Sequence, residues 1–173
     1  MLQCRWGTVQ ARGDLVSVRR VVATGTFDLL HPGHLYYLEE SKKLGDELWV
    51  IVARDMNVKH KPRPIIPEEQ RLAMIASLRP VDHAILGDKT DMFRPIEEIC
   101  PAVITIGFNQ LFDEEKIRTQ LAARNLTPKI VRIGKYADSD LCSSRLVVQE
   151  IVAKRGHDGD SDPLEQGRKQ EDT

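Results

Sequence analysis

The chain has 173 residues and a mass of 19.6 kDa, which is enough for one well-packed core and too little for two large domains. Its 41% hydrophobic and 29% charged residues are ordinary for a soluble globular protein, and its net charge of -1 disfavours electrostatically driven binding to nucleic acid. The longest apolar run, residues 48–53, is far shorter than a membrane span, and no signal peptide opens the sequence, so we expect a cytoplasmic protein without membrane partners.

The two ends of the chain differ from its middle. Residues 1–19 have scattered apolar residues without a clear period, and we predict an N-terminal extension there that is disordered or lies ahead of the domain. Residues 156–173 are mainly acidic and polar, and Leu164 is their only large aliphatic residue. Such a segment buries too little apolar surface to offset its ordering entropy, so we predict a disordered tail. The folded domain is therefore predicted to span residues 20–155.

Within the domain, apolar runs typical of strands alternate with helical patterns. In chain order, the predicted elements are a strand at 21–24, a helix at 33–44, a strand at 47–53, a helix at 67–78, a strand at 84–86, a helix at 91–100, a strand at 102–106, a helix at 113–125, a strand at 130–133 and a helix at 143–154. The strand at 47–53 is apolar on both faces, as is typical of a covered parallel strand. This alternation predicts a single α/β domain with a doubly wound, five-stranded parallel sheet.

The first predicted strand runs directly into a turn, residues 24–30, and then into the start of a helix. A strand, a tight turn and a helix start make a phosphate site, because free N–H groups and the positive end of the helix dipole face the ligand. Pro32 fixes the backbone there, and Gly33 lets a phosphate approach closely. The imidazoles of His31 and His34 could then donate hydrogen bonds to phosphate oxygens. The alternatives are a histidine pair that caps the helix and a His-x-x-His metal site.

The sequence Thr26-Phe27-Asp28, followed by His31-Pro32-Gly33-His34, resembles the signature of the HxGH nucleotidyltransferases, a superfamily that includes the cytidylyltransferases. Within this superfamily, the chain is most similar to the archaeal-type FAD synthases, through residues 52–55, 63–71, 79–82, 84–87 and 112–115. The resemblance implies a Rossmann-like nucleotidyltransferase fold and a homodimer. It also implies that the enzyme transfers the AMP moiety of ATP to FMN, which gives FAD and pyrophosphate.

The resemblance also implies roles for individual residues. His31 and His34 would stabilise the α- and β-phosphates as catalytic residues, and Lys59 and Lys61, in a proline-rich basic loop, would offset charge in the transition state. The further residues implied to bind ATP are Thr26, Phe27, Pro32, Gly33, Asn109, Tyr136, Ser143 and Ser144. Asn109 stands where the family commonly has an aspartate. A divalent metal ion such as Mg²⁺ would bridge the nucleotide phosphates, held partly by water.

Two other functions remain open from the sequence. A cytidylyltransferase that acts on a phosphorylated alcohol, such as glycerol 3-phosphate, would share the HxGH core, because the choice of acceptor depends on loops. A flavodoxin-like flavin binder without catalytic activity is the alternative from another class, and it would hold FMN tightly without releasing pyrophosphate from ATP. All three functions involve small molecules as partners.

Overall fold

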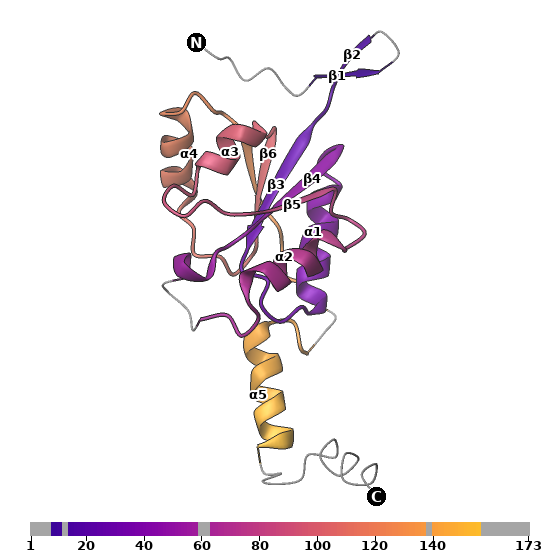
Figure 1. Ribbon diagram of the computed structural model, residues 1–173, viewed down its shortest axis with the longest axis vertical. Coiled ribbons are helices and arrows are strands. Elements are labelled where there is room, and N and C mark those ends of the chain that lie inside the picture. Colours follow the sequence, from indigo (N-terminus) through magenta and orange to yellow (C-terminus); the bar gives the residue numbers. More distant parts are fainter. Residues whose placement is uncertain (1–7, 12–13, 59–62, 138–139, 157–173) are drawn as a thin grey trace, which may run out of the picture.

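The computed structural model describes residues 8–11, 14–58, 63–137 and 140–156. Its main sheet has five strands, which pair in parallel in the order β5-β4-β3-β6-β7. These strands are β3 (Arg20–Gly25), β4 (Glu47–Val52), β5 (His83–Leu86), β6 (Val103–Ile106) and β7 (Lys129–Arg132). The structure therefore confirms the predicted doubly wound, five-stranded parallel sheet (Figure 1).

Helices lie between successive strands of the main sheet, and a last helix follows β7, as the sequence predicted. They are α1 (Pro32–Lys42), α2 (Glu68–Ala76), α3 (Arg94–Ile99), α4 (Glu114–Ala122) and α5 (Ser144–Arg155), and the 3-10 helix η1 (Asp55–Asn57) follows β4. The differences reach three residues: α4, predicted at 113–125, ends at Ala122, and α3, predicted at 91–100, begins at Arg94. Pro95 lies in its first turn, the only part of a helix that tolerates a residue without an N–H group. The proline therefore fixes where α3 can start.

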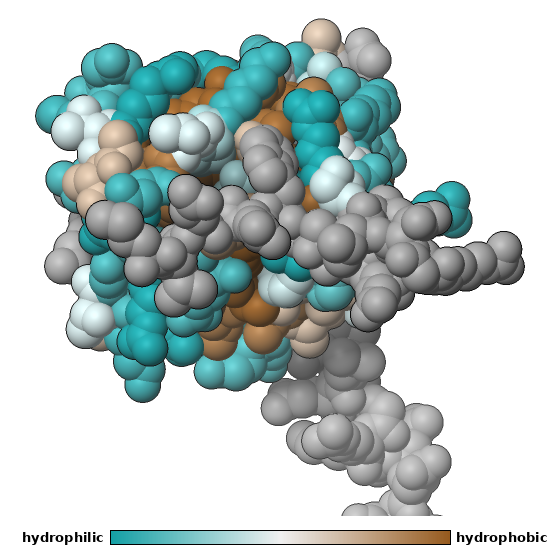
Figure 2. All heavy atoms as spheres, turned by 90° about the horizontal axis from the view of Figure 1, so that it is seen from above, coloured by the Kyte–Doolittle hydropathy of each residue, from teal (hydrophilic) through white to brown (hydrophobic). Residues whose placement is uncertain are grey.

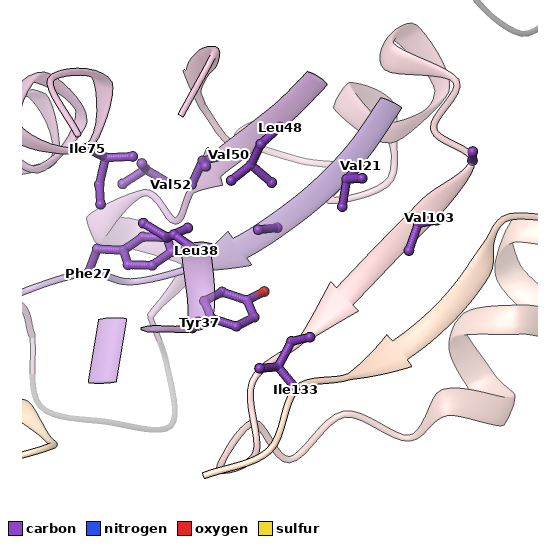
Figure 3. Packing of buried hydrophobic residues seen from close by; sticks show 12 residues of the cluster. Val21, Phe27, Tyr37, Leu38, Leu48, Val50, Val52, Ile75, Val103 and Ile133 are labelled. Atoms are coloured by element: carbon purple, nitrogen blue, oxygen red, sulfur yellow. The ribbon is translucent and has the colours of Figure 1, made fainter. Parts of the chain in front are cut away.

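The sheet is covered on both faces. Val21 and Ala23 of β3 pack on one side with Tyr37 and Leu38 of α1, and Figure 3 shows this cluster together with Phe27. The residue between them, Val22, points to the other side, where it packs in a second cluster, because successive side chains of a strand alternate between faces. The buried residues that α2, α3 and α4 contribute to the two clusters are Ile75, Ile96, Ile99 and Leu121.

A β-hairpin and the helix α5 lie at opposite ends of the domain (Figure 1). At one end, β1 (Thr8–Ala11) and β2 (Asp14–Ser17) pair in an antiparallel hairpin, which the sequence analysis did not predict because residues 1–19 show no clear alternation. Seen from this end, hydrophilic residues surround smaller hydrophobic areas (Figure 2). At the other end α5 extends away from the sheet, and none of its residues is buried. Within the described ranges, no helix is long and apolar enough to cross a membrane.

Candidate active site

The winding direction of the sheet reverses between its neighbouring strands β3 and β6. The ladder between these strands ends at the pair Ala23 and Thr105. Beyond it, the N–H group of Thr24 donates to the Tyr37 hydroxyl (3.3 Å), and the Thr24 carbonyl accepts a hydrogen bond from Nε2 of Gln110 (2.8 Å). Side chains thus replace strand pairing at this point, and the strands can separate. Ligands of open α/β sheets bind at this kind of switch point, beyond the carboxyl ends of the strands.

The turn after β3 has an unusual backbone. Phe27 is a non-glycine residue with a φ of 53°, in the left-handed region that larger residues rarely adopt. Its ring is 2% exposed and lies where a side chain on Gly25 would be, since a Cβ atom there would come within 2.7 Å of the ring. The next residue, Asp28, accepts hydrogen bonds through Oδ1 from the N–H groups of Ile65 and Ile66, each at 2.9 Å. The turn is therefore fixed by contacts on both sides of Phe27.

This turn places His31 and His34 at the start of α1. His31 is the N-cap residue, and its carbonyl accepts from the N–H group of His34 at 2.9 Å. The two rings stack with centroids 3.7 Å apart, and the His34 ring meets Phe27 edge-on at 5.2 Å. The side chain of His31 makes no capping hydrogen bond, so the structure does not support a role as a helix cap.

His31 is poised as a neutral hydrogen-bonding group. Its Nδ1 atom is buried without a hydrogen-bond partner in the part of the chain that the structure describes. Burial lowers the pKa of His31 below its ordinary value of 6.5, because desolvation disfavours the charged imidazolium. At neutral pH the ring is therefore uncharged, with one N–H donor and one acceptor nitrogen. Buried polar atoms are normally hydrogen-bonded, so this nitrogen can serve as a contact for a bound ligand.

The start of α5 lies against the start of α1. A Cβ atom on Gly33 would come within 2.8 Å of the Cys142 carbonyl oxygen and 3.1 Å of the His31 ring. Ser144 donates to the Leu29 carbonyl (3.1 Å), and Ser143 caps α5 by accepting from the N–H group of Leu146 (3.3 Å). Two helix N-termini are thus brought to the same place. Their free N–H groups and dipoles favour an anion such as a phosphate chain.

Comparison with known proteins agrees with this geometry. The family described as cytidylyltransferase-like matches residues 22–150. The FAD synthase of Methanoregula boonei is 75% identical over 141 residues, which cover 82% of this chain and 95% of that protein. The FAD synthase of Methanocorpusculum labreanum is 64% identical, with 80% and 99% covered. A solved structure from Thermoplasma volcanium, named a lipopolysaccharide core biosynthesis protein, is 50% identical with a TM-score of 0.65 and covers 69% of this chain and 99% of that one.

The chain belongs to the cytidylyltransferase-like family. It is a nucleotidyltransferase, and its sequence groups it with the archaeal proteins named FAD synthase, which confirms the resemblance found in the sequence. A further solved structure, a pantoate-beta-alanine ligase from Francisella tularensis, is 14% identical with a TM-score of 0.52, and it covers 73% of this chain and 63% of that one. At that identity the likeness concerns the fold alone.

The other predicted site residues lie on several elements. Thr26 and Phe27 form the turn, and Pro32 and Gly33 form the first turn of α1. Asn109 is exposed in the loop after β6, which starts at the same edge of the sheet. Tyr136 packs its ring against Tyr36 of α1, with centroids 5.3 Å apart. Lys59 and Lys61 lie outside the described residues.

One matched segment lies far from the site. Residues 79–82, which resemble the R-x-V-D element of the family, precede β5 and therefore lie at the amino edge of the sheet. There the Asp82 carboxylate accepts from the N–H group of Leu48 (2.6 Å) and from the ammonium of Lys42 (2.5 Å). The geometry assigns this segment to the assembly of the sheet rather than to the reaction.

The sequence analysis missed two arginines that hold the loops of the site. Arg71 of α2 donates to the carbonyl of Thr26. Arg132, at the end of β7, donates to the carbonyls of Gly107 (3.2 Å), Gln110 (3.0 Å) and Phe112 (3.2 Å) and so holds the loop that carries Asn109. A signal for Arg71 was present in the sequence, because it precedes Ile75 by four residues and therefore lies on the buried side of α2.

Proposed function

We propose that the chain is an FMN adenylyltransferase, which makes FAD from FMN and ATP. A phosphate oxygen of FMN attacks the α-phosphorus of ATP in line. The bond from that phosphorus to the bridging oxygen of the pyrophosphate breaks as the new bond forms, and no covalent enzyme intermediate is needed. The observation that carries the proposal is the stacked pair of His31 and His34 at the switch point, next to the capped start of α5.

The residues around the α-phosphorus would act by position and charge. The imidazoles of His31 and His34 donate hydrogen bonds to oxygens of the α- and β-phosphates, where negative charge grows in the transition state. The Ser143 hydroxyl and the free N–H groups at the start of α5, that of Ser144 among them, hold the β- and γ-phosphates that leave as pyrophosphate. The backbone of Thr26 and Phe27 lines the nucleotide pocket. Pro32 and Gly33 let the phosphates approach the first turn of α1.

The remaining predicted residues have less direct roles in this proposal. Asn109 offers a side-chain carbonyl to ATP, and Tyr136 lies beside α1 as a contact for the nucleotide. Lys59 and Lys61 offset charge on the attacking phosphate. In the ranges that the structure describes, no three His, Cys, Asp or Glu side chains form a metal site. In this proposal the divalent ion enters with the substrate, as the complex that ATP forms with it.

The choice of substrates decides between the candidate functions. We would incubate the enzyme with ATP or CTP, each in combination with FMN or glycerol 3-phosphate, and measure pyrophosphate and FAD. The proposal predicts pyrophosphate and FAD only with ATP and FMN. Pyrophosphate from CTP and glycerol 3-phosphate would assign the chain to the cytidylyltransferases. Tight FMN binding without any pyrophosphate would assign it to the non-catalytic flavin binders.

We also propose that the enzyme is a cytoplasmic homodimer. The proposal is supported by α5, which extends from the body with large apolar side chains exposed, among them Leu146, Ile151 and Val152. A short helix is marginally stable alone in water, and a second copy of the chain would cover these side chains. Light scattering after size-exclusion chromatography should give twice the 19.6 kDa mass of the chain. A monomer at micromolar concentration would contradict the dimer.

A further inference from the structure

Arg71 is an arginine without any exposed surface. Its guanidinium donates to the Ile66 carbonyl through Nε (2.9 Å) and to the Ala53 carbonyl through Nη2 (2.9 Å), and Nη1 donates to the carbonyl of Thr26. Nη2 also donates to the carboxylate of Asp55 at 2.5 Å. One planar group therefore joins the turn after β3, the end of β4 and the segment that leads into α2. Burial of a charge is tolerated only when it is paired and hydrogen-bonded in this way.

The residues on both sides of Phe27, which has the left-handed backbone, are held by hydrogen bonds. Arg71 holds Thr26, which precedes Phe27, and the N–H groups of Ile65 and Ile66 hold Asp28, which follows it. A left-handed backbone at a bulky residue persists only where the surroundings fix it from several directions. Tyr37 and Gln110 hold Thr24 at the end of β3, and Arg71 holds the carbonyl of Thr26, directly before Phe27.

The ring of Phe27 transmits the conformation of the turn to the histidines. It is buried, meets the His34 ring edge-on with centroids 5.2 Å apart, and lies 6.4 Å from the Tyr37 ring. The His34 ring in turn stacks on His31 at 3.7 Å. If Phe27 relaxed to an ordinary φ, its ring would move, and His34 would lose the surface against which it packs.

We propose that Arg71 is a positioning residue, which aims the two histidines by holding the Thr26 carbonyl and hence the left-handed turn at Phe27. Arg71 does not touch the substrate and acts through His34. This inference rests on the proposed role of the histidines in the transition state. A displacement of about 1 Å in such a group lowers the rate by about a hundredfold, whereas binding of ATP depends on many other contacts.

The test substitutes Arg71→Lys, which keeps the charge. A lysine ammonium has three donors at one point and cannot reproduce a planar fork that spans four acceptors. We expect kcat to fall at least about tenfold while KM for ATP and FMN changes less than about twofold. In the background of His34→Ala, the same substitution should lower kcat by less than about twofold, because residues that act through one group are not additive.

A matched control is Arg124→Lys. Arg124 is also a multiply bonded arginine, with ion pairs to Asp91 (3.1 Å) and Glu97 (2.6 Å) and a contact with the Phe93 ring at 4.8 Å, but it joins α4 to α3. This variant should lose stability without the change in kcat. If Arg71→Lys lowers kcat equally in the presence and absence of His34, or raises only KM, the proposal is wrong.

Two other variants keep the test decisive. If Arg71→Lys does not fold, Asp55→Asn is the variant to use, because it keeps the contacts of Arg71 with three carbonyl groups and weakens only its ion pair with residue 55. It should give a smaller loss of kcat, and this loss should again be absent in the His34→Ala background. A loss that persists in that background would overturn the proposal. If His34→Ala itself keeps normal turnover, the proposed function of the histidines fails, and that result is separate from any effect of Arg71.

Discussion

The two edges of the sheet are held by different kinds of contact. At the amino edge, carboxylates and cations satisfy each other and the backbone: Asp82 binds Leu48 and Lys42, and Arg20 binds Glu47 and the Ile99 carbonyl. At the carboxyl edge, Phe27 adopts a left-handed backbone and His31 has a buried nitrogen without a partner in the described ranges. Cys100 and Asn125 also have a positive φ, but they lie where α3 and α4 end, and a left-handed residue is a common way to end a helix, whereas Phe27 ends no helix.

The difference indicates where the chain has been shaped for a ligand. Strained backbone and unpaired buried polar atoms cost stability, and they persist mainly where function needs them. The contacts at the amino edge contribute only stability, so their loss should leave catalysis intact. Loss of the features at the carboxyl edge should lower the rate of catalysis. Substitutions of similar size at the two edges can therefore separate stability from activity.

The largest contrast is expected between two histidines. His34→Ala should lower kcat by at least about a hundredfold, the usual effect of removing a donor to the transition state, with little change in the folded structure. The matched variant is His83→Ala, which removes a ring stacked on Trp49 at the start of β5, on the amino edge. It should keep normal turnover. Steady-state production of FAD and circular dichroism measure both effects, and near-normal turnover of His34→Ala would remove this residue from the reaction.

A pair of glycines at the carboxyl edge gives the next largest effect. Helix propensity alone would make Gly33→Ala stabilising by about 1 kcal/mol. The new Cβ atom would come within 2.8 Å of the Cys142 carbonyl oxygen. Relief of this clash would push the starts of α1 and α5 apart. We expect a destabilisation of about 1–3 kcal/mol and a strong loss of kcat. The control is Gly87→Ala, whose Cβ atom would have no neighbour closer than 3.6 Å and which should behave like the parent in urea unfolding and in turnover.

At the amino edge, Asp82→Ala should affect stability alone. The substitution leaves the N–H group of the buried Leu48 and the ammonium of Lys42 without this acceptor. An unsatisfied buried donor costs about 1–3 kcal/mol, so the midpoint of urea unfolding should decrease. Turnover below the unfolding transition should be unchanged. A fall in kcat comparable to that of His34→Ala would contradict the division between the two edges.

Much of the fold and part of the site could be predicted from the sequence. The strands were predictable because buried parallel strands such as β4 are continuously apolar, and the histidine pair because it follows a strand and a tight turn. The hairpin at residues 8–17 was not predictable, since these residues have no clear alternation. The anchoring role of Arg71 was also beyond prediction, because its acceptors belong to three segments that are separated in sequence and meet only in the folded chain.

The smallest expected effect concerns the protonation of His31. Burial holds the pKa of this imidazole below 6.5, so the folded protein binds fewer protons than the unfolded chain as the pH falls below that value. The contribution of His31 to stability is therefore constant above about pH 6.5, declines as the pH falls towards the lowered pKa, and levels off below it. Bound ATP should raise the pKa, because negative phosphates favour the imidazolium. Imidazole proton resonances, assigned with a His31→Asn variant that lacks the signal, measure both values. A pKa at or above 6.5 without ATP would contradict the burial of the ring, and no increase with ATP would show that the His31 ring does not face the triphosphate.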